Sequence, residues 1–262
     1  MCSLHAAATR LTPRHAGNTV AAPMPASLLV PLLLVGVVLG LARPTFGAPV
    51  ITPALFDFVT FDGIDYVRWE DEPGRPLAPP DLGAEFATVG CSFGEDSRGC
   101  PYGMDAGAAF MPAGTRMYAV RGYATEFRLA AVWKDRIFLY QAWRNPRARA
   151  GGDLFDLAGK VRTIDVETDG ADPGGRRHAT VTAPGDVEAL IDLIVRAQTR
   201  RPLPHAPGET RYWLTFWFAD GTTLGRPYYP ESRELMGGVV VGGDFTRLLE
   251  GHLATIAPRA SP

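Results

Sequence analysis

The chain has 262 residues, of which 46% are hydrophobic and 21% charged, and its formal net charge is −2. These proportions are typical of a globular protein and exclude a collagen-like or wholly disordered chain. Residues 1–48 contain three arginines and no acidic residue, so the rest of the chain carries a net charge of about −5. Such an acidic domain lacks the basic surface that nucleic acids and anionic lipids require, so neither is an expected partner.

The N-terminal region has the pattern of an export signal. Arg10 and Arg14 precede the uncharged, apolar residues 26–42, and Thr45 and Gly47 put small residues at the −3 and −1 positions for cleavage after Gly47. A positive region, an apolar stretch and a small-residue cleavage site are typical of a secretory signal peptide. We therefore expect residues 1–48 to be a signal peptide and the protein to be secreted or extracytoplasmic. The alternative is an uncleaved N-terminal membrane anchor, because the apolar stretch is near the shortest spanning length.

Two Asp-Gly pairs organise the rest of the chain. Strand-like runs at 56–61 and 64–69 flank Asp62-Gly63, and a second hairpin is expected around Asp220-Gly221. An Asp-Gly pair favours a hairpin because both residues tolerate a positive φ. Lys134-Asp135 is expected to turn a third pair of strands. The remaining strands are expected at 86–89, 117–120, 127–132, 137–143, 161–167, 179–181, 212–218, 222–229 and 239–241.

Two short helices are expected in the C-terminal part, because apolar residues recur there at helical spacing. They are Val187, Leu190, Ile191 and Ile194, and then Phe245, Leu248, Leu249 and Leu253. The predicted fold class is therefore α+β, mostly antiparallel β-hairpins with two short helices. Residues 169–177 read as a linker between a β-rich domain, 49–168, and an α+β domain, 178–256. The alternative is one continuous domain.

Cys91 and Cys100 are the two cysteines that follow the predicted signal peptide. Extracytoplasmic compartments are oxidising, so paired cysteines there normally form a disulfide. The residues between them are mostly polar and include glycines, which allows the loop to close to disulfide geometry. We therefore expect a structural Cys91–Cys100 disulfide.

No established catalytic or metal-binding motif occurs in the sequence. The histidines after residue 48 are far apart, and HExxH, CxxC, GxSxG and a Gly-rich phosphate loop are all missing. We therefore expect no metal, no cofactor and no catalytic residue. The alternative is an envelope polysaccharide hydrolase with a carboxylate pair. Its candidate acids are Glu70, Asp71, Glu72, Glu95, Asp96, Asp153, Asp156 and Glu231, of which residues 70–72 are expected to form a solvated turn.

Aromatic and basic side chains offer two further binding hypotheses. Alternation along residues 212–218 puts Trp213 and Trp217 on one face, and because both faces are apolar we expect a covered central strand. The alternative is an exposed ligand platform of Trp213 and Trp217 that stacks on sugars or peptides. The arginines in 144–149, 176–177 and 200–201 are expected to form solvated loops, and the alternative is that they bind an anionic envelope polymer.

Residues 105–131 carry a series of short motifs, namely Met111-Pro112-Ala113-Gly114-Thr115, Tyr118-Ala119-Val120, Arg121-Gly122-Tyr123 and Phe127 to Ala131. This stretch resembles an uncharacterised family of bacterial extracytoplasmic proteins, secreted or envelope-anchored. The resemblance implies an exported domain and no particular activity. We expect a non-catalytic, envelope-associated domain that recognises an unknown envelope polymer or protein through its surface. Within the motif, Arg128 is expected to pair inside its own sheet.

Overall fold

A computed structural model describes residues 56–70, 72–96, 98–168, 177–206 and 208–254. The predicted signal peptide, the candidate Asp71 and nearly all of the predicted linker lie outside these residues. In the described ranges, no helix is both long enough and apolar enough to cross a membrane.

The first sheet has eight strands in the order β3-β6-β7-β8-β2-β1-β5-β4. They are β1 (Asp57–Phe61), β2 (Ile64–Arg68), β3 (Leu82–Thr88), β4 (Cys91–Ser92), β5 (Gly107–Ala108), β6 (Arg116–Val120), β7 (Arg128–Trp133) and β8 (Arg136–Arg144). Neighbouring strands are antiparallel except β4 and β5, which run parallel and make the sheet mixed. A short 3-10 turn, η2 (Pro79–Asp81), precedes β3.

Two hairpins of this sheet close through two-residue turns, as the sequence predicts. Phe61 pairs with Ile64 across Asp62-Gly63, whose φ angles are 52° and 71°. Lys134 and Asp135, between β7 and β8, have φ angles of 50° and 58°. Positive φ at both central positions matches the right-handed twist of the flanking strands.

The second sheet has seven antiparallel strands in the order β10-β9-β12-β13-β14-β15-β11. They are β9 (Val161–Thr168), β10 (His178–Val181), β11 (Gln198–Thr199), β12 (Tyr212–Phe218), β13 (Thr223–Tyr229), β14 (Glu234–Leu235) and β15 (Val239–Val240). A 3-10 turn, η3 (Gly151–Asp153), lies between the last strand of the first sheet and β9.

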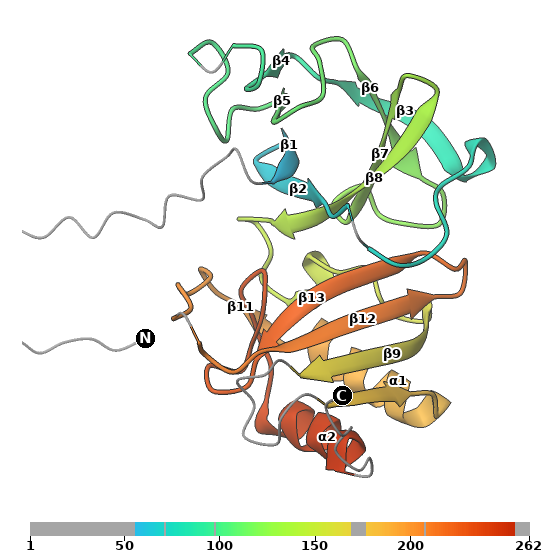
Figure 1. Ribbon diagram of the computed structural model, residues 1–262, viewed down its shortest axis with the longest axis vertical. Coiled ribbons are helices and arrows are strands. Elements are labelled where there is room, and N and C mark those ends of the chain that lie inside the picture. Colours follow the sequence, from blue (N-terminus) through green and yellow to red (C-terminus); the bar gives the residue numbers. More distant parts are fainter. Residues whose placement is uncertain (1–55, 71, 97, 169–176, 207, 255–262) are drawn as a thin grey trace, which may run out of the picture. The chain divides into compact units, whose positions relative to one another are not determined.

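Helices α1 (Pro184–Val195) and α2 (Gly243–Ala254) contact each other and the β9–β10 side of the second sheet (Figure 1). Helix α1 buries the four apolar residues that the spacing predicts, and α2 buries three of its four, leaving Leu248 partly exposed. Two mostly antiparallel sheets and two C-terminal helices agree with the predicted α+β class.

One hydrophobic core includes side chains from both sheets, among them Leu129 of β7 and Phe216 of β12. Strand β9, which precedes the expected linker, pairs with β10 on one side and with β12 on the other. The expected boundary between 168 and 178 therefore falls between two paired strands of one sheet.

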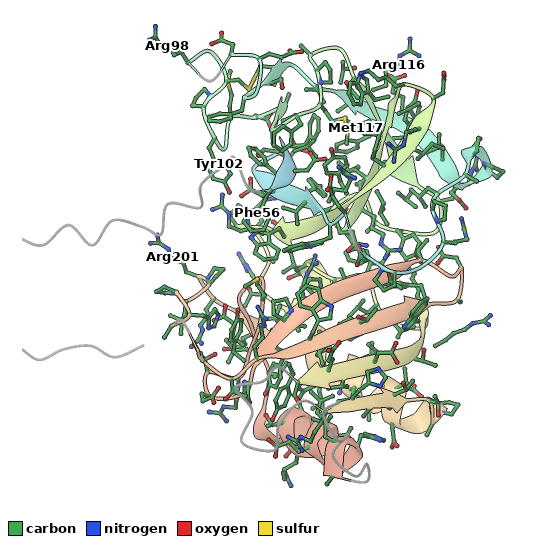
Figure 2. The ribbon with its side chains drawn as sticks, viewed as in Figure 1. Phe56, Arg98, Tyr102, Arg116, Met117 and Arg201 are labelled. Carbon is green, nitrogen blue, oxygen red and sulfur yellow. A yellow bond between two sulfur atoms is a disulfide. The ribbon has the colours of Figure 1, made fainter. Side chains whose placement is uncertain are left out.

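On β6, Arg116 points outward and the neighbouring Met117 is fully buried (Figure 2). The short strands β4, β5, β11 and β14 were not expected from the sequence. Each has only two residues, so no alternating pattern can reveal it.

Candidate functional site

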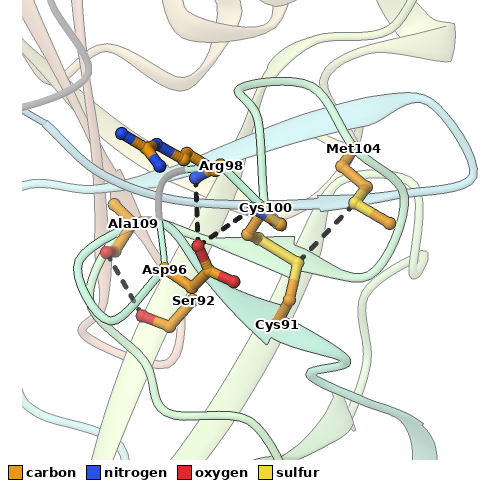
Figure 3. Close-up of a disulfide and its surroundings, with 8 residues drawn as sticks. Cys91, Ser92, Asp96, Arg98, Cys100, Met104 and Ala109 are labelled. Carbon is orange, nitrogen blue, oxygen red and sulfur yellow. Dashed lines mark hydrogen bonds between the residues drawn. A yellow bond between two sulfur atoms is a disulfide. The ribbon is translucent and has the colours of Figure 1, made fainter.

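The Cys91–Cys100 disulfide closes a polar loop beside β4 (Figure 3). The two Cα atoms are 5.6 Å apart, which is consistent with the expected pairing. Inside the loop, the Asp96 carboxylate accepts hydrogen bonds from the backbone N–H groups of Arg98 (3.1 Å) and Gly99 (3.0 Å). The candidate acid Asp96 is therefore used to shape the loop.

Large apolar side chains are exposed just after the disulfide. Tyr102, Met104 and Phe110 have exposed fractions of 39%, 45% and 52%. The Tyr102 ring also packs edge-on against Phe58 of β1 at 5.0 Å, and Figure 2 shows it beside the β1–β2 hairpin. The disulfide loop thus holds an apolar segment at the surface, anchored through one ring.

The two tryptophans of the candidate platform are half-buried on β12, which lies between β9 and β13. Trp213 packs edge-to-face on Trp69, the residue that follows β2, with ring centres 6.0 Å apart. The Trp217 indole N–H donates to the Asp165 carboxylate at 2.6 Å. The central strand is as expected, whereas a role of Trp213 and Trp217 as a ligand platform stays a prediction.

Arg128 lies at the centre of a buried polar region between the sheets. Its side chain is fully buried and donates to the Thr222 hydroxyl at 2.8 Å and to the Thr223 carbonyl at 2.6 Å. The guanidinium carbon lies 4.0 to 4.9 Å from the centres of three rings, those of Tyr123, Phe127 and Phe218. Arg128 thus joins two sheets, and the expectation that it pairs within its own sheet is wrong.

Arg226 of β13 is also fully buried, and it donates to the Ala142 carbonyl of β8 at 2.7 Å. Burial lowers its pKa to about 10, although the nearby Glu72 carboxylate opposes that shift. Each buried arginine therefore donates to at least one oxygen of the other sheet. Arg226 also donates to the Gly225 carbonyl of its own strand at 2.7 Å, and the Nε atoms of both arginines have no hydrogen-bond partner among the described residues.

Glu72 faces the same region and accepts a hydrogen bond from the Gly225 N–H at 2.5 Å. Burial raises the pKa of Glu72 to about 6, even though Arg226, the Gly225 N–H and Arg128 favour its ionised form. The expectation of a solvated turn is therefore wrong for Glu72, because residues 72–75 fold against the second sheet: the Thr223 hydroxyl also donates to the Pro73 carbonyl.

A separate surface pocket of about 370 Å³ lies where the loop before β7 meets the loop after β8. Its lining includes Phe127 and Leu154, which are buried, and charged residues of both signs. The charged residues are Glu126, Arg147, Arg149, Asp153 and Asp156. Its volume lies at the lower end of the range for small-molecule pockets.

Two of the pocket carboxylates already have partners. Asp153 accepts hydrogen bonds from the backbone N–H groups of Arg149 (2.8 Å) and Ala150 (2.9 Å), which lower its pKa. Asp156 accepts from the Ala124 N–H at 2.9 Å and pairs with Lys160. These contacts fix the pocket wall.

The other candidate acids lie elsewhere. Glu70 pairs with Arg68 at 2.9 Å, and Glu231 lines a different pocket, together with Glu250. Of the eight candidates, the structure therefore brings only Asp153 and Asp156 together in one pocket, among the residues that it describes.

The arginines singled out in the sequence divide into two roles. Arg144 pairs with the buried Asp65 at 2.8 Å, whereas Arg147 and Arg149 line the pocket. Glu126 was not a candidate, because no motif surrounds it and the pocket forms only when distant segments meet. The density of arginines in 144–149 was the available signal.

In the described part of the chain, no group of three or more His, Cys, Asp or Glu side chains is arranged to hold a metal ion. His205 stacks on Tyr229 with 3.4 Å between the ring centres, and its Nδ1 lies 3.2 Å from the Glu209 carboxylate.

The chain matches no protein-family model, no curated protein and no solved structure. Its function must therefore be argued from the pocket itself.

Proposed function

We propose that this chain is an exported, envelope-associated domain that acts by binding, and that its ligand site is the 370 Å³ pocket between Glu126 and Arg149. The ligand is a component of the envelope, and no cofactor takes part.

Export is supported by the charge and hydropathy pattern of residues 1–48, by the family resemblance and by the Cys91–Cys100 disulfide. Disulfides persist mainly in oxidising compartments, whereas cytosolic thiols are kept reduced.

The observation that carries binding over hydrolysis is the state of the pocket carboxylates. A hydrolase that uses two carboxyl groups needs one of them to hold a proton, which requires a raised pKa. Asp153 has the opposite shift, because two backbone N–H groups stabilise its ionised form. Glu72 does have a raised pKa, but it accepts from Gly225 and is not among the pocket residues. This pattern favours recognition of a polar ligand.

The test of export uses cells that express the full chain. We expect the protein in the extracytoplasmic fraction, with an N-terminus near residue 48 and no free thiol after denaturation without reductant. Cytoplasmic protein that starts at Met1, or two free thiols in the exported form, would overturn this part.

The test of binding uses the exported protein and isolated bacterial envelope fragments. We expect saturable binding without release of reducing sugars or new amino groups. Turnover that is lost in Asp153→Asn and Asp156→Asn would replace the binding function by the hydrolase. Unaltered envelope binding by the double variant Glu126→Gln/Arg149→Gln would remove the site from this pocket.

A further inference from the structure

Charges of opposite sign line the pocket without neutralising each other. The described residues contain no ion pair that joins Glu126 to Arg147 or Arg149. Opposite charges on adjoining mobile side chains readily pair at a protein surface when they are in reach. Their separation leaves one negative and one positive group facing the same space.

The Arg149 side chain is the least engaged cation of the pocket. Its backbone N–H binds Asp153, and its charge contributes to the lowered pKa of that carboxyl group, but its guanidinium makes no hydrogen bond or ion pair with a described residue. Arg147 donates through one nitrogen to the Asp62 carbonyl at 2.5 Å, which leaves its other donors for a ligand. A guanidinium presents a planar fork of donors that suits a carboxylate.

Glu126 is the least engaged anion. Within the described part of the chain, its carboxylate accepts only from the adjacent Thr125 hydroxyl, at 3.2 Å. Its backbone is fixed from below, because the buried Tyr66 hydroxyl donates to the Thr125 carbonyl at 2.9 Å. Burial raises the pKa of Tyr66, Glu126 adds to that rise and Arg147 opposes it, so both charges act on the same buried hydroxyl.

The floor between these charges is apolar. Phe127 and Leu154 are each 1% exposed, and Phe127 is held against Phe155 with ring centres 6.5 Å apart. These two side chains therefore present almost no surface to a ligand, and the charged groups around the pocket determine which ligand it favours.

We infer that the pocket binds a zwitterionic ligand of amino-acid or short-peptide size, with its carboxylate at Arg149 and Arg147 and its ammonium group at Glu126. This inference rests on the proposed function, because it names the ligand class of that same site. A ligand with only one charge would leave either Glu126 or Arg149 facing the pocket unpaired.

Trialanine and its blocked forms provide the test, measured by calorimetry on the protein exported from the full chain. We expect trialanine with free termini to bind. N-acetylation or C-terminal amidation should each weaken binding at least tenfold, because each removes one charged hydrogen-bonding partner.

Two variants separate the two ends of the ligand. Arg149→Gln should weaken the preference for the free carboxylate over the amide, with Arg147 retaining part of it, and keep the preference for the free amine. Glu126→Gln should do the reverse. Arg162→Gln and Glu188→Gln are matched controls on exposed residues outside the pocket, and they should keep both preferences.

The inference fails if trialanine does not bind or if the blocked peptides bind as tightly as the free one. If envelope fragments still bind and Glu126→Gln/Arg149→Gln abolishes that binding, the ligand class is wrong and the proposed function stands. If envelope fragments do not bind either, both fail.

Discussion

Two regions of this molecule concentrate arginine, and they use it in opposite ways. Between the sheets, the buried Arg128 and Arg226 donate to oxygens of the opposite sheet. In the surface pocket, Arg149 is exposed and its guanidinium has no partner among the described residues. In the first region the arginine charges stabilise the fold, whereas in the second the arginine charge remains accessible to a ligand.

This difference indicates where a ligand can act. A buried charge is tolerated only when the protein supplies hydrogen bonds or an opposite charge for it, as the oxygens around Arg128 and Arg226 do. An exposed charge is solvated and can exchange water for a ligand at small cost. The buried region therefore holds the sheets together, and the pocket is the candidate for recognition.

The largest expected effect is at Arg128. We expect Arg128→Ala to lower the free energy of unfolding by about 3–5 kcal/mol, because it leaves a cavity and removes donors from Thr222 and Thr223. Chemical denaturation measures the loss. Arg128→Met fills most of the volume and should recover only part of it. A loss below about 1 kcal/mol for Arg128→Ala would show that the buried arginine stabilises the fold no more than the pocket arginines do.

The stability cost of removing the disulfide can be compared with the cost of Arg128→Ala. Replacing Cys91 and Cys100 by serine frees a loop of about ten residues, and loop-closure entropy predicts a cost of roughly 2.7 kcal/mol. The same denaturation experiment measures it. We expect the covalent tie to contribute less than Arg128, because the tie orders one surface loop while Arg128 connects two sheets. A larger loss in the cysteine variant would reverse that ranking.

The next effect is pH-dependent and comes from Glu72. An ordinary glutamate has a pKa of 4.5, and burial raises that of Glu72 to about 6. Between these values the folded protein binds more protons than the unfolded chain, so the free energy of unfolding falls as pH rises. At about 1.4 kcal/mol per unit of pKa shift, the full loss is about 2 kcal/mol, and it is spread from about pH 3.5 to about pH 7.

Comparison with Glu72→Gln isolates this contribution, because other titrating groups are common to both proteins. The glutamine can keep the acceptor for the Gly225 N–H but cannot ionise. We expect the variant to gain about 2 kcal/mol relative to the parent as pH rises from about 3.5 to about 7. A stability difference that is constant across this range would show that Glu72 is not desolvated by the fold.

Both regions also show how far the sequence can be interpreted. Turns at Asp62-Gly63 and Lys134-Asp135 and the apolar stripe of α1 follow from local rules, and the structure agrees. Glu72 and Arg128 were misjudged because their partners lie far along the chain: Gly225 is 153 residues from Glu72, and Thr222 is 94 residues from Arg128. A charge in a sequence does not reveal whether another segment will cover it.

The sequence indicated the arginines of the candidate site but not its glutamate. The density of arginines in 144–149 indicated Arg147 and Arg149 as candidates, because a cluster of basic residues can be recognised from the sequence alone. Glu126 has no such neighbours, and its place opposite those arginines arises because β7 and β8 are paired and bring 126 and 147 to the same end. Long-range strand pairing therefore supplies what local patterns lack.

The smallest expected effect is in the pocket, and it completes the comparison. We expect Arg149→Gln and Glu126→Gln each to change the free energy of unfolding by no more than about 0.5 kcal/mol, as is usual for exposed side chains without a specific partner. Denaturation of each variant beside Arg162→Gln measures this. If either pocket variant instead lost as much stability as Arg128→Ala, the replaced charge would stabilise the fold and would not be available to a ligand. If a pocket variant keeps its stability and loses ligand binding, the pocket arginine serves recognition and the buried arginines serve folding. A guanidinium group contributes to folding only where the chain itself supplies its hydrogen-bond partners.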